Sequence, residues 1–226
     1  MTTTFRSISA VIYDMDGLLL DTEGFYTEVT QHIAGRYGKT FDWSIKANMI
    51  GRPAMDSARY LVAALDLPLT PEQYLAEREQ LLLERVAFAQ AKPGAEQLVR
   101  HLAARGVPQA VATSSSRDFF KIKTQRHNWF EIFDCVVTGD DPAIKQGKPA
   151  PDIFLTAAER LQTPPERCLV FEDAPSGMRA ALAAEMAVVV IPDPNMDRTH
   201  YQPAHQVLDS MVDFDPVLWS LPGVVD

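Results

Sequence analysis

The sequence predicts an α/β protein in which helices cover both faces of a parallel sheet. Short apolar runs recur along the chain, and helical patterns lie between them. Strands that alternate with helices favour a parallel sheet. A long segment without strand-like runs follows the first of them, and it is too long for an ordinary strand-to-helix loop. We therefore expect a Rossmann-like core with an inserted helical cap domain.

The elements of the core can be placed from their apolar spacing. The strand-like runs lie at residues 10–13, 109–113, 135–138, 168–171 and 187–191. The helical patterns are marked by apolar residues that share a face: Ala95, Leu98 and Leu102, then Ile153, Ala157 and Leu161. Gly106 closes the first of these helices, and Ser176 opens a further one.

The strandless segment covers residues 22–91 and leaves a core of residues 1–21 and 92–226. Apolar residues repeat in it at helical spacing, as at Phe25, Val29 and Ile33. The segment begins a few residues after a pair of aspartates, which favours a cap over that site. The alternative is a set of extra helices packed on the sheet edge. Residues 92–94 (Lys-Pro-Gly) are expected to form the returning hinge.

Composition excludes several classes of protein. A net charge of −9 argues against nucleic acid as a partner. No apolar run approaches the roughly 20 residues of a membrane span, and the N-terminus lacks the apolar stretch of a secretory signal. We expect a cytoplasmic monomer with no membrane partner. Its two cysteines, Cys135 and Cys168, are expected to be buried free thiols.

Asp14 and Asp16 directly follow the first apolar run, and Gly17 ends it as a turn. Two carboxylates delivered together at a strand end repel each other and are costly to desolvate. A divalent cation is a common reason for such a pair. The alternative is a solvated turn with two surface aspartates.

Three further motifs follow later strand-like runs. Thr113, Ser114 and Ser115 form a hydroxyl cluster, Lys148 precedes a proline at a helix start, and Glu172 and Asp173 form a second acidic pair. Taken singly, these motifs could be a polar loop, a solvated lysine and an acidic helix cap. Ligands of parallel sheets bind beyond the carboxyl ends of the strands, and all of these residues fall there.

In this order and spacing the four motifs resemble the signatures of the haloacid dehalogenase superfamily, most of whose members are magnesium-dependent phosphatases. The match runs almost from end to end. The segments at residues 14–23, 139–142, 147–155 and 168–177 also resemble the pseudouridine-5′-phosphatase branch, near the beta-phosphoglucomutase-like phosphatases.

The resemblance implies a role for each motif. Asp14 would be the nucleophile that forms an aspartyl-phosphate, and Asp16 would be the acid/base. Magnesium (Mg2+) would be held by Asp14, the backbone carbonyl of Asp16 and Asp173. Glu172 would be a fourth ligand or a close neighbour of the ion.

The same resemblance predicts the phosphate site and a small phosphorylated metabolite as substrate. Thr113, Ser114, Ser115 and Lys148 would hold the phosphate, and Lys148 would also contact the nucleophile.

In the predicted cap, Arg52 is the candidate for recognising the alcohol part of the phosphate ester. The alternative is that this arginine forms only a surface salt bridge. Tyr26 and Ala54 stand where the mutases have a histidine and an arginine, which favours net hydrolysis. The substrate is expected to be pseudouridine 5′-phosphate or another nucleotide or sugar phosphate. The alternatives are a phosphosugar mutase and a non-catalytic relative that binds a phosphorylated metabolite.

Overall fold

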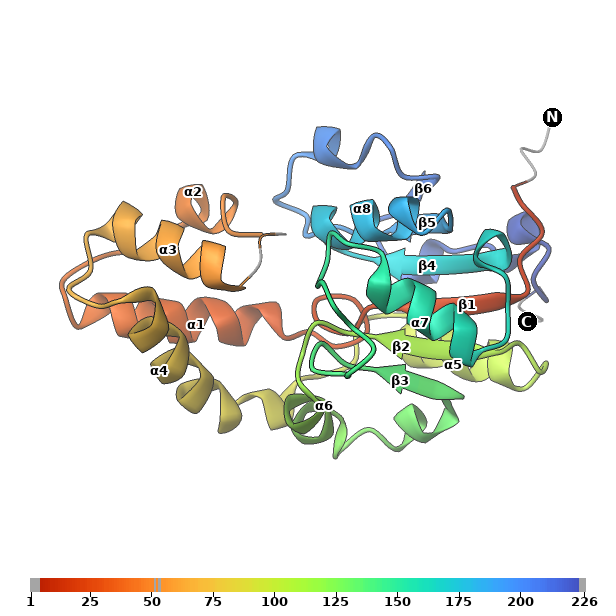
Figure 1. Cartoon of the computed structure of the whole chain (residues 1–226), viewed down its shortest axis with the longest axis horizontal. Helices are drawn as coiled ribbons and strands as arrows, with labels where there is room; N and C mark the ends of the chain where they lie inside the picture. The colour runs from red at the N-terminus through yellow and green to blue at the C-terminus, as the bar shows by residue number, and fades with distance from the viewer. Residues whose placement is uncertain (1–4, 51, 53, 224–226) are drawn as a thin grey trace.

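A parallel sheet forms the centre of the computed structural model, which describes residues 5–50, 52 and 54–223. The spatial order of the strands is β3-β2-β1-β4-β5-β6 (Figure 1). Their bounds are β1 (Ala10–Tyr13), β2 (Gln109–Ala112), β3 (Cys135–Val137), β4 (Cys168–Glu172), β5 (Ala187–Val190) and β6 (Gln206–Val207). The predicted α/β class is confirmed, and β6 is a short edge strand that the apolar pattern did not reveal.

Successive side chains of a strand point to opposite faces of the sheet, so the hydrophobic core has two layers. Val11 and Tyr13 of β1 pack on one face of the sheet, and Ala10 and Ile12 pack on the other. The first face is covered by α5 (Ala95–Ala103), and the second by α7 (Asp152–Arg160) and α8 (Pro175–Ala183). Because β1 pairs with β2 and β4, it is buried on every side.

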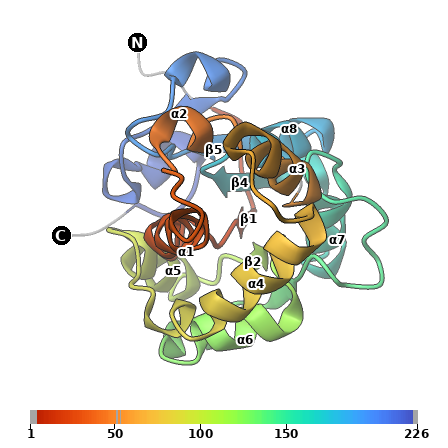
Figure 2. The ribbon, with the colours of Figure 1, turned by 90° about the vertical axis from the view of Figure 1, so that its left-hand side faces the viewer.

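The strandless segment folds into helices with a hydrophobic core of their own. These are α1 (Glu23–Gly35), α2 (Trp43–Lys46), α3 (Ala54–Leu65), α4 (Pro71–Leu83) and the 3-10 turn η1 (Val86–Phe88). Val29, Ile33, Leu61 and Tyr74 are among the buried residues that hold them together. Figure 2 looks from this side and shows α1 to α4 around the ends of the sheet strands. We call the helices α1 to α4 with η1 the cap helices.

Two adjacent backbone segments join the cap helices to the sheet. Leu20 and Ala91 form an antiparallel bridge, and the N–H of Asp21 donates to the carbonyl of Gln90. The outgoing and returning chains therefore lie side by side, close to the predicted hinge. The helix α6 (Arg117–Thr124) packs on both parts, since Phe120 contacts the core cluster and Phe119 contacts that of the cap helices.

Short 3-10 turns complete the chain: η2 (Asn128–Ile132), η3 (Pro165–Arg167), η4 (Arg198–Tyr201), η5 (Met211–Asp213) and η6 (Pro216–Trp219). Both cysteines are free, with Cys168 buried and Cys135 partly exposed. In the described part of the chain, every helix is too short or too polar to traverse a bilayer.

Candidate active site

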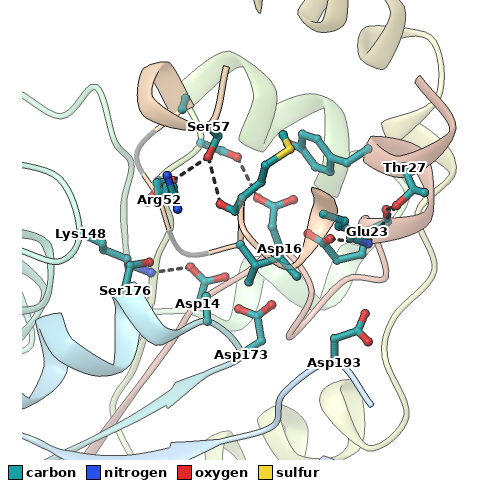
Figure 3. A pocket seen from close by; sticks show the side chains of 18 of the residues that line it. Asp14, Asp16, Glu23, Thr27, Arg52, Ser57, Lys148, Asp173, Ser176 and Asp193 are labelled. Carbon is teal, nitrogen blue, oxygen red and sulfur yellow. Dashed lines mark hydrogen bonds and ion pairs between the residues drawn. The ribbon is translucent and has the colours of Figure 1, made fainter. Parts of the chain in front are cut away.

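The predicted motifs converge on one cavity between the strand ends and the cap helices. Its volume is about 520 Å³. The described residues that line it include all of the predicted site residues: Asp14, Asp16, Arg52, Thr113, Ser114, Ser115, Lys148, Glu172 and Asp173. Figure 3 shows Asp14 and Asp173 beside the strand ends, on the floor of the cavity, with Asp16 and Arg52 above them in this view.

Asp14 lies at the end of β1 and is paired with Lys148, which comes from the loop before α7. The Lys148 ammonium donates to Asp14 Oδ1 at 2.5 Å and to Glu172 Oε1 at 2.6 Å. Burial raises the pKa of Asp14 to about 7, and the nearby charges of Glu172 and Asp16 add to this effect against the opposing ammonium of Lys148. Asp14 is therefore a buried carboxylate whose charge depends on Lys148.

Asp16 has a different set of partners. The Lys123 ammonium lies 2.6 Å from Asp16 Oδ1, and the Ser115 hydroxyl donates to Asp16 Oδ2 at 2.8 Å. Burial alone would raise the pKa of Asp16, but the charge and hydrogen bond of Lys123 and the bond from Ser115 outweigh it, so the pKa lies below its usual value. Both oxygens of this carboxylate are engaged.

Unlike Asp14, Asp16 and Glu172, Asp173 has no cationic partner among the described residues. Burial raises its pKa well above the usual value, and the charges of Glu172 and Asp14 reinforce this. Glu172 is already satisfied, since it accepts from Lys148 and from the backbone N–H groups of Asp173 and Ala174. Glu172 thus shapes the turn after β4 and does not cap α8.

Two glycines allow this close approach of acidic groups. Gly17 has a φ of +78°, and a Cβ there would lie 2.3 Å from Asp173 Oδ2. A Cβ on Gly177 would lie 1.7 Å from Glu172 Oε1. The turn after β1 and the first turn of α8 therefore need glycine to accommodate the two carboxylates.

The hydroxyl cluster divides into three roles by geometry. Thr113 is buried and accepts the N–H of Ser115 at 3.1 Å, which shapes the loop. Ser115 is held by its bonds to Asp16 and Lys123. Ser114 is exposed at the cavity, and its hydroxyl makes no hydrogen bond within the described part of the chain. Of the three, Ser114 is the residue best placed to receive an anion.

Two arginines reach the cavity wall, Arg52 from the connection between α2 and α3 and Arg78 from α4. The Arg52 guanidinium lies 4.9 Å from the centre of the Tyr60 ring, and its sequence neighbours 51 and 53 lie outside the described residues. Arg78 on α4 lies 5.6 Å from the centres of both the Tyr26 and Tyr74 rings. The Nε of Arg78 is buried and has no hydrogen-bond partner among the described residues. An unpaired buried donor at a cavity is a candidate for contact with a ligand.

The acidic groups fit a divalent cation. Asp14 and Asp173 present carboxylates to the same part of the cavity in Figure 3. In the turn that follows β1, as far as the structure describes it, no backbone hydrogen bond ends on the carbonyl oxygen of Asp16. No three described histidine, cysteine or acidic side chains form a complete metal site. Two carboxylates and a carbonyl nevertheless suit Mg2+, which keeps several of its waters.

The sequence did not single out Lys123 or Arg78: Arg78 lines the cavity, and Lys123 lies behind its wall in contact with Asp16. Lys123 lies on α6, an element of eight residues with no distinctive motif, and its side chain is fully buried. A lone lysine or arginine on an amphipathic helix gives no signal that separates it from a surface residue.

Comparisons with known proteins agree with the motifs. The family model of the haloacid dehalogenase-like hydrolases matches residues 8–185. The chain is 48% identical to (DL)-glycerol-3-phosphatase 2 of Arabidopsis thaliana, over 97% of this chain and 94% of that protein. It is 43% identical to a protein of Drosophila melanogaster named a probable pseudouridine-5′-phosphatase, over 98% and 97% of the two chains.

A solved structure shares the whole fold. The haloacid dehalogenase (HAD) family hydrolase from Deinococcus radiodurans R1, solved with bound phosphate and sodium, is 26% identical, with a TM-score of 0.76 over 97% of this chain and 100% of that one. The chain therefore belongs to the haloacid dehalogenase-like hydrolases and is an enzyme of the phosphatase type. The predicted resemblance to pseudouridine-5′-phosphatases is confirmed, and the glycerol-3-phosphatase is the more identical of the two relatives.

Proposed function

Given this family, we propose that the chain is a magnesium-dependent phosphomonoesterase that acts through an aspartyl-phosphate on Asp14. One observation carries the proposal: the buried Asp14 is held by Lys148 on the floor of a cavity whose wall carries a serine hydroxyl and an arginine Nε that have no hydrogen-bond partner among the described residues. A phosphate monoester repels an anionic nucleophile, so the attack needs local positive charge. Lys148 supplies it in a chain of net charge −9.

The residues divide the reaction into two steps. Asp14 Oδ2, the oxygen that Lys148 does not contact, attacks phosphorus, and the bond from phosphorus to the alkoxide breaks. Asp16 in its protonated form donates a proton to the departing alkoxide, whereas the Lys123 pair lowers its pKa and favours the ionised form before substrate binds. It then takes a proton from the water that attacks the aspartyl-phosphate, which releases inorganic phosphate and restores Asp14.

The remaining groups hold the phosphate. Ser114 and Lys148 are proposed to contact its oxygens, and Thr113 and Ser115 to fix the loop that presents Ser114. A magnesium ion bound by Asp14, Asp173 and the Asp16 carbonyl would neutralise phosphate charge. Since both oxygens of Glu172 are engaged, we propose that Glu172 orients Lys148 and does not bind the ion directly.

Residues 22–91 are proposed to act as the cap that selects the alcohol. The two relatives are named for glycerol 3-phosphate and pseudouridine 5′-phosphate, both of which are phosphates of a primary alcohol with further hydroxyls. A cavity of about 520 Å³ is in the range that holds small metabolites. We therefore propose a polyol or nucleoside monophosphate as substrate. A cytoplasmic location and a monomeric state stay predictions.

The decisive experiment replaces Asp14 with Asn and measures phosphate release from glycerol 3-phosphate, pseudouridine 5′-phosphate and flavin mononucleotide. The variant keeps the shape and loses the nucleophile, so turnover should fall by at least ~10³-fold, or roughly 4 kcal/mol of barrier. Near-normal turnover by the variant would refute the assignment. Transfer of the phosphate to another hydroxyl of the substrate, without its release, would instead indicate a mutase, which Tyr26 and Ala54 argue against.

A further inference from the structure

A fully buried lysine that the reaction above does not use lies behind the cavity wall, in contact with three residues that line the cavity. Lys123 projects from α6, and its side chain is 0% exposed. Its ammonium donates to Asp16 at 2.6 Å, to the Ser115 hydroxyl at 2.8 Å and to the Tyr26 hydroxyl at 3.2 Å. These three acceptors satisfy all three N–H groups of a lysine, so its geometry is fully determined.

The partners of Lys123 come from separate parts of the fold. Asp16 follows β1, Ser115 follows β2, and Tyr26 lies on the cap helix α1. The helix α6 itself contacts both hydrophobic clusters through Phe120 and Phe119. Lys123 therefore joins the candidate acid/base to the cap helices.

Burying an ammonium is costly, and the fold accepts this cost only where the charge is paired. A solvent-facing aspartate would need no such partner. Without Lys123, the Asp16 carboxylate would keep only the bond from Ser115 and could rotate about its side-chain torsions. A proton donor must lie within hydrogen-bond reach of the leaving oxygen, and a displacement of about 1 Å can cost 10²-fold in rate.

We propose that Lys123 is a positioning residue, which fixes the Asp16 carboxyl group for proton transfer to the leaving alcohol and couples that position to the cap through Tyr26. The proposal rests on the proposed function, because it assumes that Asp16 is the acid/base. Lys123 contacts neither Ser114 nor Lys148, the two residues proposed to hold the phosphate, so substrate binding should depend on it little.

The test is the dependence of kcat/KM on the acidity of the leaving group. For Lys123→Met, kcat/KM should fall by about 10²-fold or more on glycerol 3-phosphate, because its alkoxide needs a proton. On p-nitrophenyl phosphate, whose anion leaves unaided, the fall should be below about 10-fold. A series of substituted phenyl phosphates between these two should give a steeper slope than the wild type, with KM nearly unchanged.

A double-mutant cycle links the effect to Asp16. Asp16→Asn should give the same steep slope, and Lys123→Met should add almost nothing in its presence. Lys121→Met is the matched control, since Lys121 lies on the same helix with a side chain 68% exposed. It should behave as the wild type.

Each outcome decides the proposal. The proposal is overturned if Lys123→Met lowers kcat/KM equally for all leaving groups, or if its effect adds to that of Asp16→Asn. It is also overturned if kcat/KM does not fall or if it rises. Circular dichroism and thermal melting show whether the variants fold. If Lys123→Met does not fold, the same kinetic measurements are made on Lys123→Gln. Asp14→Asn is assayed in parallel: if that variant remains active, the proposed function fails. If only the Lys123 prediction fails, the role of Asp14 stands.

Discussion

Removing the nucleophile should stabilise the metal-free protein at alkaline pH. Asp14 is 7% exposed, and burial raises its pKa from 3.8 to about 7. A carboxyl group that holds its proton more tightly in the folded chain stabilises the fold fully below about pH 4. This stabilisation is lost as the pH rises through about 7. Asp14→Asn removes the titration and should gain stability relative to the wild type as the pH increases.

The size of the effect follows from the pKa. Between about pH 5 and the folded pKa of about 7, ionisation of Asp14 costs about 3 kcal/mol at 1.36 kcal/mol per pH unit. Lys148 keeps its pair with Glu172 at 2.6 Å in either protein, so we expect the variant to gain only part of this free energy. We expect the advantage of the variant to grow by about 2 kcal/mol from about pH 5 to about pH 8. In a chain of this size that is about 4–8 °C in Tm.

The assay is thermal melting in a chelator at both pH values, followed by addition of magnesium. Magnesium should reverse the order at about pH 8, because the wild type offers the ion one carboxylate more. Asp118→Asn is the control, since the Asp118 side chain is 86% exposed and should show no such pH dependence. A difference in Tm that is the same at both pH values, or a variant less stable at about pH 8, would refute the electrostatic reasoning.

Three further predictions concern the metal and the cap. Asp173→Ala should raise the magnesium concentration for half-maximal activity by about 10-fold or more, and an unchanged titration would exclude this ligand. Arg78→Ala should change the ratio of kcat/KM values between glycerol 3-phosphate and pseudouridine 5′-phosphate by about 10-fold, because its Nε is unpaired at the cavity. Arg52→Ala should change that ratio more than the inhibition constant of inorganic phosphate, and an intact ranking would remove Arg52 from the specificity site.

The sheet was largely predictable because its strands are continuous apolar runs. The predicted 109–113 and 168–171 agree with β2 and β4 to within one residue. The edge strand β6 spans two residues, Gln206 and Val207, so it has too little apolar pattern to be detected. The helix α6 has eight residues and was also missed. Short elements are specified by what they pack against, which the local sequence does not contain.

The candidate site was predictable where its residues follow strand ends and not where they lie on helices. Parallel topology alone brings Asp14, Ser114 and Asp173 to one edge of the sheet. Lys121 and Lys123 are two residues apart on α6 and therefore point in nearly opposite directions. One is 68% exposed and the other fully buried. Only the tertiary packing of α6 against the cap helices decides which lysine meets the acid/base.

The distribution of charge explains why a chain of net charge −9 can accept a phosphate. Lys148 forms ion pairs with Asp14 and Glu172, and Lys123 forms one with Asp16. The two lysines therefore neutralise different carboxylates of the site. Asp173 is left without a cation among the described residues, and its pKa is raised first by burial and then by the negative charge of Glu172 and Asp14. A divalent cation there would complete the neutralisation beside the nucleophile. It would leave the Lys123 pair undisturbed, so metal affinity should be insensitive to Lys123→Met.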